Sequence, residues 1–67
     1  MSSTEIHALA DRVRSEFNEM PGLRLTIPQA ARLWGLEAPA CRAIIEALVG
    51  SSFLRWTPRG AIAKAEG

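Results

Sequence analysis

The sequence predicts a mainly α-helical chain that ends in a small β-hairpin. Apolar residues recur at spacings of three and four over most of the chain, and proline and glycine residues separate these stretches. Near the C-terminus the spacing changes to an alternation of two, which is typical of strands. The 67 residues suffice for a single domain spanning residues 1–67, with a core that we expect over about residues 4–64.

The N-terminal segment from Ser3 to Met20 has the pattern of an amphipathic helix. Ser3 or Thr4 can cap its first turn. Pro21 and Gly22 end the helix, because neither residue favours its continuation. The apolar residues that share one face of this helix are Ile6, Leu9, Val13, Phe17 and Met20.

A short strand and a second helix follow. Residues 23–25 alternate between apolar and basic side chains, as a short strand does. Thr26 and Gln29 have the spacing of a capping box, in which each side chain accepts a hydrogen bond from the backbone of the other. We therefore expect a helix over residues 27–34. Gly35 ends it, because glycine tolerates the left-handed conformation of a helix C-terminus.

The third helix is predicted from Glu37 or Ala38 to Val49. Arg42 and Glu46 lie one turn apart on its polar side. The glycine and serines at residues 50–52 end it. Its apolar side contains Cys41, Ile44, Ile45, Leu48 and Val49.

The last segment predicts a hairpin with a turn at residues 57–60. This turn sets Trp56 opposite Ile62 on an inner, apolar face. It sets Arg55 opposite Ala63 on the outer face. We expect Trp56 to pack in the core or in a dimer contact.

Composition argues against several classes of function. The single cysteine, Cys41, allows no internal disulfide, and it lies far in sequence from the only histidine, His7, so we expect no metal site. No set of residues typical of a catalytic site is present, so we expect no enzyme, no cofactor and no small-molecule substrate. No apolar run approaches the roughly 18 residues of a membrane span, and no signal-peptide pattern occurs, so we expect a cytoplasmic protein without membrane contact.

Residues 29–49 resemble a helix-turn-helix. Ala31 is the small residue of the first helix, Gly35 lies in the turn, and the apolar Leu36, Cys41 and Ile44 follow at the usual offsets. A small residue and a glycine let two helices cross at about 90–120° over a short turn. Residues 48–60 resemble the entry into a wing. The chain thus resembles a bacterial winged helix-turn-helix domain, which implies three helices and a short sheet of two or three strands.

This resemblance implies binding to double-stranded DNA, with the third helix in the major groove and the hairpin on the adjacent backbone. Among the positions of the third helix that would face the groove, only Arg42 can donate to a base edge, beside alanines and two glutamates. Phosphate contacts that depend little on sequence should therefore dominate. The DNA-binding residues implied are Arg42, Arg55, Arg59, Lys64, Arg32 and Thr26.

Two alternatives stay open. The same fold can serve a protein partner or a homodimer, since fold alone does not decide function, and the alanine-rich third helix favours this interpretation. The arginines can also be ordinary solvated charges that pair locally with Glu37, Glu46 or Glu66. We expect His7 to be exposed and Cys41 to be a small core residue.

Overall fold

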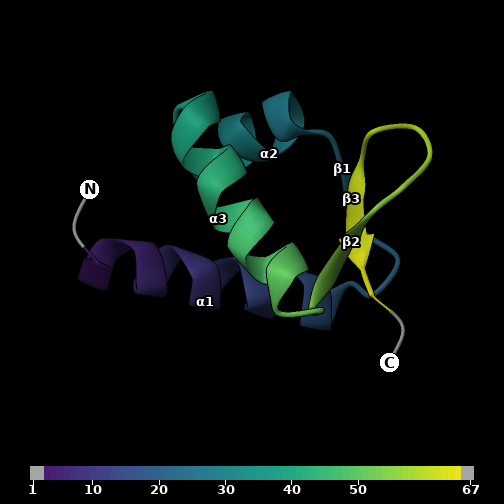
Figure 1. Cartoon of the computed structure of the whole chain (residues 1–67), viewed down its shortest axis with the longest axis horizontal. Helices are drawn as coiled ribbons and strands as arrows, with labels where there is room; N and C mark the ends of the chain where they lie inside the picture. The colour runs from purple at the N-terminus through teal and green to yellow at the C-terminus, as the bar shows by residue number, and fades with distance from the viewer. Residues whose placement is uncertain (1–2, 66–67) are drawn as a thin grey trace.

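A computed structural model describes residues 3–65 of the chain. Its helices are α1 (Ser3–Glu19), α2 (Ile27–Trp34) and α3 (Ala38–Gly50). They pack against an antiparallel sheet of β1 (Arg24–Leu25), β2 (Leu54–Trp56) and β3 (Ile62–Lys64), in the spatial order β1-β3-β2 (Figure 1). The mainly helical layout with a small sheet is as the sequence predicted. No helix among the described residues is both long and apolar enough to cross a membrane.

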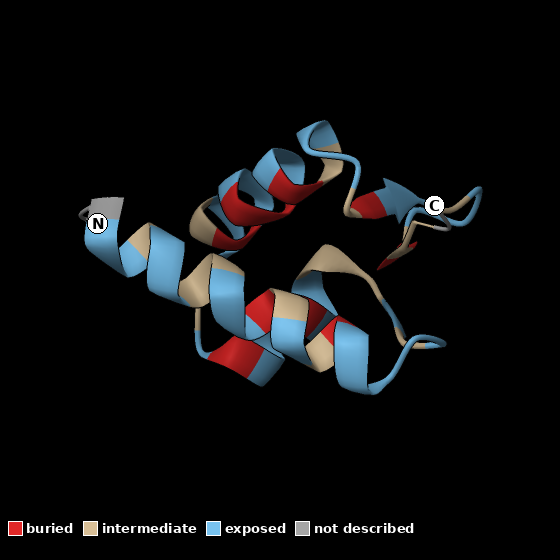
Figure 2. Cartoon of the chain, turned by 90° about the horizontal axis from the view of Figure 1, so that it is seen from below, coloured by how far each residue is buried: buried red, intermediate tan, exposed pale blue. Residues whose placement is uncertain are grey.

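Helix α3 contacts α1, α2 and strand β2, so the core lies where the three helices meet the inner face of the sheet. Figure 2 shows the buried positions on the inward faces of the helices. Within residues 4–65, no polar or charged residue is buried. The core cluster consists of Val13, Phe17, Ala30, Ala31, Trp34, Cys41, Ile44, Ile45, Leu48, Leu54 and Ile62.

Both predicted ends of α2 are confirmed. The N–H of Gln29 donates to Oγ1 of Thr26 at 3.3 Å, and the N–H of Thr26 donates to Oε1 of Gln29 at 3.0 Å. These reciprocal bonds satisfy backbone donors that the first helical turn leaves unpaired. At the other end Gly35 has φ 65°, and the N–H of Leu36 donates to the carbonyl of Ala31 at 2.8 Å.

The C-terminus of α3 lies at the predicted residues 50–52, and Ser52 is the one that takes the left-handed conformation. Ser52 has φ 66°, in the left-handed region that favours glycine. Its N–H donates to the carbonyl of Val49, and the N–H of Phe53 donates to that of Leu48, both at 3.0 Å. These two bonds form a Schellman motif, which here has a serine where glycine is usual.

The register of the hairpin is confirmed. Trp56 pairs with Ile62 and Arg55 pairs with Ala63. The N–H of Gly60 donates to the carbonyl of Thr57 at 3.0 Å, and Gly60 has φ 77°, as a hairpin loop of three residues requires.

For three residues, the structure differs from the burial or exposure that the sequence predicted. Helix α1 ends at Glu19, so Met20 lies beyond it and is 47% exposed instead of packing on the core face. Trp56 is 37% exposed and is not a core residue, because it lies at the end of β2 next to the loop. Ala63 shares its face with exposed arginines, yet it is only 4% exposed, because β3 is the central strand and has a neighbour on each side.

Candidate nucleic-acid interface

Charge is distributed unevenly between α1 and the rest of the described chain. Residues 3–19 contain four acidic and two basic residues, whereas residues 20–65 contain six basic and two acidic residues. The excess of positive charge therefore belongs to α2, the sheet and the hairpin loop, whereas α3 contains one arginine and one glutamate. The six basic residues are Arg24, Arg32, Arg42, Arg55, Arg59 and Lys64.

Arg42 on α3 has two neighbours at the surface. Its Nε lies 3.6 Å from Oε1 of Glu46, one turn further along the helix, and both side chains are more than half exposed. Its Cζ lies 5.8 Å from the centroid of the Trp56 ring on β2. The arginine therefore joins α3 to the hairpin just before the loop.

Arg59 lies in the loop of the hairpin and is exposed. The loop extends beyond the sheet on the side away from α1 (Figure 1). Arg59 forms no ion pair with another residue in the described range 3–65. A phosphate oxygen can therefore approach its guanidinium without displacing a carboxylate of that range.

Arg55 faces away from Trp56, because adjacent residues of a strand point to opposite faces. It pairs in register with Ala63, and Ala63 pairs on its other side with Arg24 of β1. The outer face of the sheet thus has an arginine on each side of Ala63. Sequence alternation placed Arg24 on an outer face, but only the β1–β3 register places it in the same row as Arg55.

Lys64 lies apart from the loop. It pairs with Leu54, and its Nζ is 6.0 Å from the centroid of the Phe53 ring. Leu54 is the first residue of β2, whereas Arg59 lies in the loop that follows the last residue of this strand. Lys64 therefore belongs to the base of the hairpin and does not join Arg42 and Arg59.

Thr26 and Arg32, the remaining predicted site residues, belong to α2. The hydroxyl oxygen of Thr26 accepts the capping bond, which leaves its hydrogen able to donate to a phosphate. Arg32 is exposed and is one of the residues that line the hollow described next.

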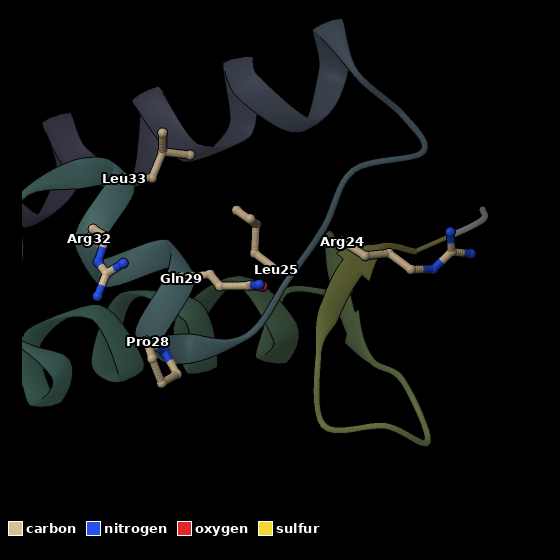
Figure 3. A pocket seen from close by; sticks show the side chains of 6 residues that line it. All are labelled: Arg24, Leu25, Pro28, Gln29, Arg32 and Leu33. Atoms are coloured by element: carbon tan, nitrogen blue, oxygen red, sulfur yellow. The ribbon is translucent and has the colours of Figure 1, made fainter.

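An open hollow of about 700 Å³ lies between α2 and β1. Arg24 and Arg32 extend outward from it in different directions, as Figure 3 shows. Leu33 is 52% exposed at this surface, the highest exposure of any large apolar residue in the described chain. Neither the hollow nor the exposure of Leu33 was predicted from the sequence. The lining residues are Arg24, Leu25, Pro28, Gln29, Arg32 and Leu33.

Cys41 and His7, the residues considered for redox chemistry and metal binding, lie in the core and at the surface respectively. Cys41 is buried in the core, as predicted, and burial raises the pKa of its thiol. A raised pKa reduces the thiolate fraction that redox chemistry needs. His7 is exposed, as predicted. In the described part of the chain, no group of three or more His, Cys, Asp and Glu side chains is placed to hold a metal ion.

The chain matches no protein-family model, and it has no significant match among curated proteins or solved structures.

Proposed function

We propose that this chain is a winged helix-turn-helix module that binds double-stranded DNA, with α3 in the major groove and the hairpin loop on the adjacent backbone. The order of elements α1-β1-α2-α3-β2-β3 and the strand order β1-β3-β2 support this assignment of the fold. The observation that carries the function is the contact of Arg42 with Trp56, which places the only basic residue of α3 beside the hairpin whose loop contains Arg59.

The charge distribution favours contact with a polyanion. Arg42 is the only one of the six basic residues after α1 that forms an ion pair within residues 3–65. The other five basic residues can therefore bind a phosphate without first breaking an ion pair with a carboxylate of residues 3–65. Arginine presents a planar fork that suits phosphate oxygens. Contacts of this kind release counterions and depend strongly on salt but little on sequence.

The six predicted residues have different parts in this proposal. Arg42 and Arg59 contact DNA directly, and Thr26 donates to a phosphate at the start of α2. Arg32, Arg55 and Lys64 lie on other surfaces and contribute mainly to the positive potential that attracts DNA. The proposal includes no catalytic step, cofactor or metal.

The test is a fluorescence-anisotropy titration of a random-sequence duplex at several salt concentrations. Arg59→Ala should weaken binding to any duplex and reduce the magnitude of the salt slope by about one. Arg12→Ala is the matched control, because Arg12 is exposed on the acidic α1 and carries the same charge. Equal effects of the two substitutions, or absence of binding at low salt, would contradict the proposal.

A second candidate, a docking or dimerisation domain, is favoured by the exposure of Leu33. The large exposed apolar residues of the described chain are Met20, Leu33 and Trp56, and none of them lies on α3. A protein partner would therefore dock on the hollow between α2 and β1 rather than on the alanine-rich face of α3. Light scattering at high protein concentration separates the two candidates. A dimer that Leu33→Ser dissociates supports docking, and a monomer that binds duplex DNA supports the first proposal.

A further inference from the structure

We infer that Trp56 and Glu46 hold Arg42 in position to read a guanine, a specificity that rests on the proposed binding to DNA. In the major groove, guanine presents two acceptors, O6 and N7, and a bidentate arginine is the side chain that most often recognises them. Arg42 then contacts the base directly, and Trp56 and Glu46 act as positioning residues.

The ion pair with Glu46 leaves the two terminal nitrogens of Arg42 able to donate to a base. The recorded approach of Glu46 is to Nε of Arg42, at 3.6 Å, which places the carboxylate on the Nε side of the guanidinium. Nη1 and Nη2 therefore remain available as two parallel donors, which is the geometry that O6 and N7 of guanine require.

Trp56 restricts the movement of the Arg42 side chain from a second direction. The indole ring lies 5.8 Å from Cζ of Arg42, which is within the range of a cation–π contact. The backbone pairing of Trp56 with Ile62 fixes the strand from which the ring projects. An arginine that is already restricted on two sides loses less conformational freedom when it binds a base.

The rest of the exposed surface of α3 cannot replace Arg42. Its other exposed positions are Ala38, Pro39, Ala43, Glu46, Ala47 and Gly50, none of which has a side-chain hydrogen-bond donor. A preference for guanine at one position, with weak preferences elsewhere, is therefore the expected pattern.

The experiment begins with selection of bound duplexes from a random pool by the whole chain, followed by sequencing. We expect enrichment of a G·C pair at one position. In the enriched duplex that guanine is then replaced by 7-deazaguanine, which lacks N7, or by inosine, which keeps O6 and N7 and lacks only the minor-groove amino group. 7-Deazaguanine should weaken binding about tenfold, whereas inosine should change it less than about twofold.

Variants of Arg42 and Trp56 test whether these two side chains produce the preference. Arg42→Ala should abolish the difference between the two analogues. Trp56→Leu should reduce that difference several-fold more than it reduces affinity for random duplex, and Trp56→Phe should restore part of it. Arg12→Ala should leave it unchanged. Circular dichroism confirms that each variant is folded.

The outcomes separate this inference from the proposed function. Binding to random duplex without enrichment of a G·C pair, or with equal responses to the two analogues, overturns the guanine reading and leaves DNA binding intact. Equal losses of preference and of general affinity in Trp56→Leu overturn the positioning role. Failure to bind any duplex at low salt overturns both proposals.

Discussion

The guanidinium group of Arg42 lies over the indole ring of Trp56 and so connects α3 to β2 at the surface. An exposed cation–π contact contributes only about 0.5–1 kcal/mol. Core residues of the same two elements, among them Ile44 of α3 and Leu54 of β2, contribute about 1.5–3 kcal/mol for each large buried side chain. The core therefore sets the placement of helix and hairpin, and the surface contact sets the orientation of Arg42.

The two tryptophans should differ sharply in their effect on stability. Trp34 is 6% exposed and Trp56 is 37% exposed. Trp34→Ala should lower the free energy of unfolding by about 3–5 kcal/mol, which approaches the whole stability expected of a chain this small. Trp56→Ala should lower it by about 1 kcal/mol. Urea denaturation measures both, and equal losses would show that Trp56 is a core residue after all.

Trp34→Phe should be much milder than Trp34→Ala. The indole N–H of Trp34 is buried without a hydrogen-bond partner among the residues that the structure describes. An unsatisfied buried donor costs about 1–3 kcal/mol, so its removal offsets part of the packing that the smaller ring loses. We expect a net change within about 1 kcal/mol in the same denaturation experiment. A loss as large as that of Trp34→Ala would mean that the N–H has a stabilising partner.

Ser52→Gly should stabilise the chain. A residue other than glycine in the left-handed conformation costs about 1–2 kcal/mol. Glycine has greater conformational freedom in the unfolded chain, and this reduces the stability gained by the substitution. The net gain of about 0.5–1 kcal/mol should raise the melting temperature by about 2–8 °C. Gly35→Ala is the matched control, because Gly35 has φ 65° and its added methyl group would meet nothing within 4 Å. It should lower the melting temperature through backbone strain alone, and a lower melting temperature for Ser52→Gly would contradict this account.

Stability should fall at alkaline pH through Cys41. Burial raises the pKa of its thiol in the folded chain above the ordinary value of 9.0. Below that value both states keep the proton and stability is unaffected. As the pH rises from 9.0 through the raised pKa, the unfolded chain releases its proton first, so unfolding becomes more favourable. Urea denaturation at pH 8 to 10.5 should show a steeper loss for the wild type than for Cys41→Ala; parallel curves would refute this contribution.

Arg55→Ala should weaken duplex binding less than Arg59→Ala does. Arg55 lies on the outer face of the sheet, in the row with Ala63 and Arg24, whereas Arg59 lies in the loop. A charge that acts only at long range is screened over about 8 Å at physiological salt. The two variants should therefore differ most in anisotropy titrations near 0.15 M salt. A larger effect of Arg55→Ala would place the DNA on the outer face of the sheet.

Local signals explain which parts of the fold were predicted from the sequence. The capping box at Thr26, the left-handed Gly35 and the hairpin register depend on residues within a few positions of one another, and all are confirmed. The burial of Ala63 was missed, because it depends on β1, which comes from far away in the sequence. The same holds for the contact of Arg42 with Trp56, which requires the packing of α3 against β2.

The most direct test of DNA binding through α3 and the hairpin is an NMR titration of the isotopically labelled chain with a random-sequence duplex at low salt. Binding through these two elements predicts that the largest amide shift changes fall in the first half of α3, around Arg42, and in the loop at residues 57–60, with small changes in α1. Changes concentrated in α1, or an unchanged spectrum at saturating duplex, would contradict it.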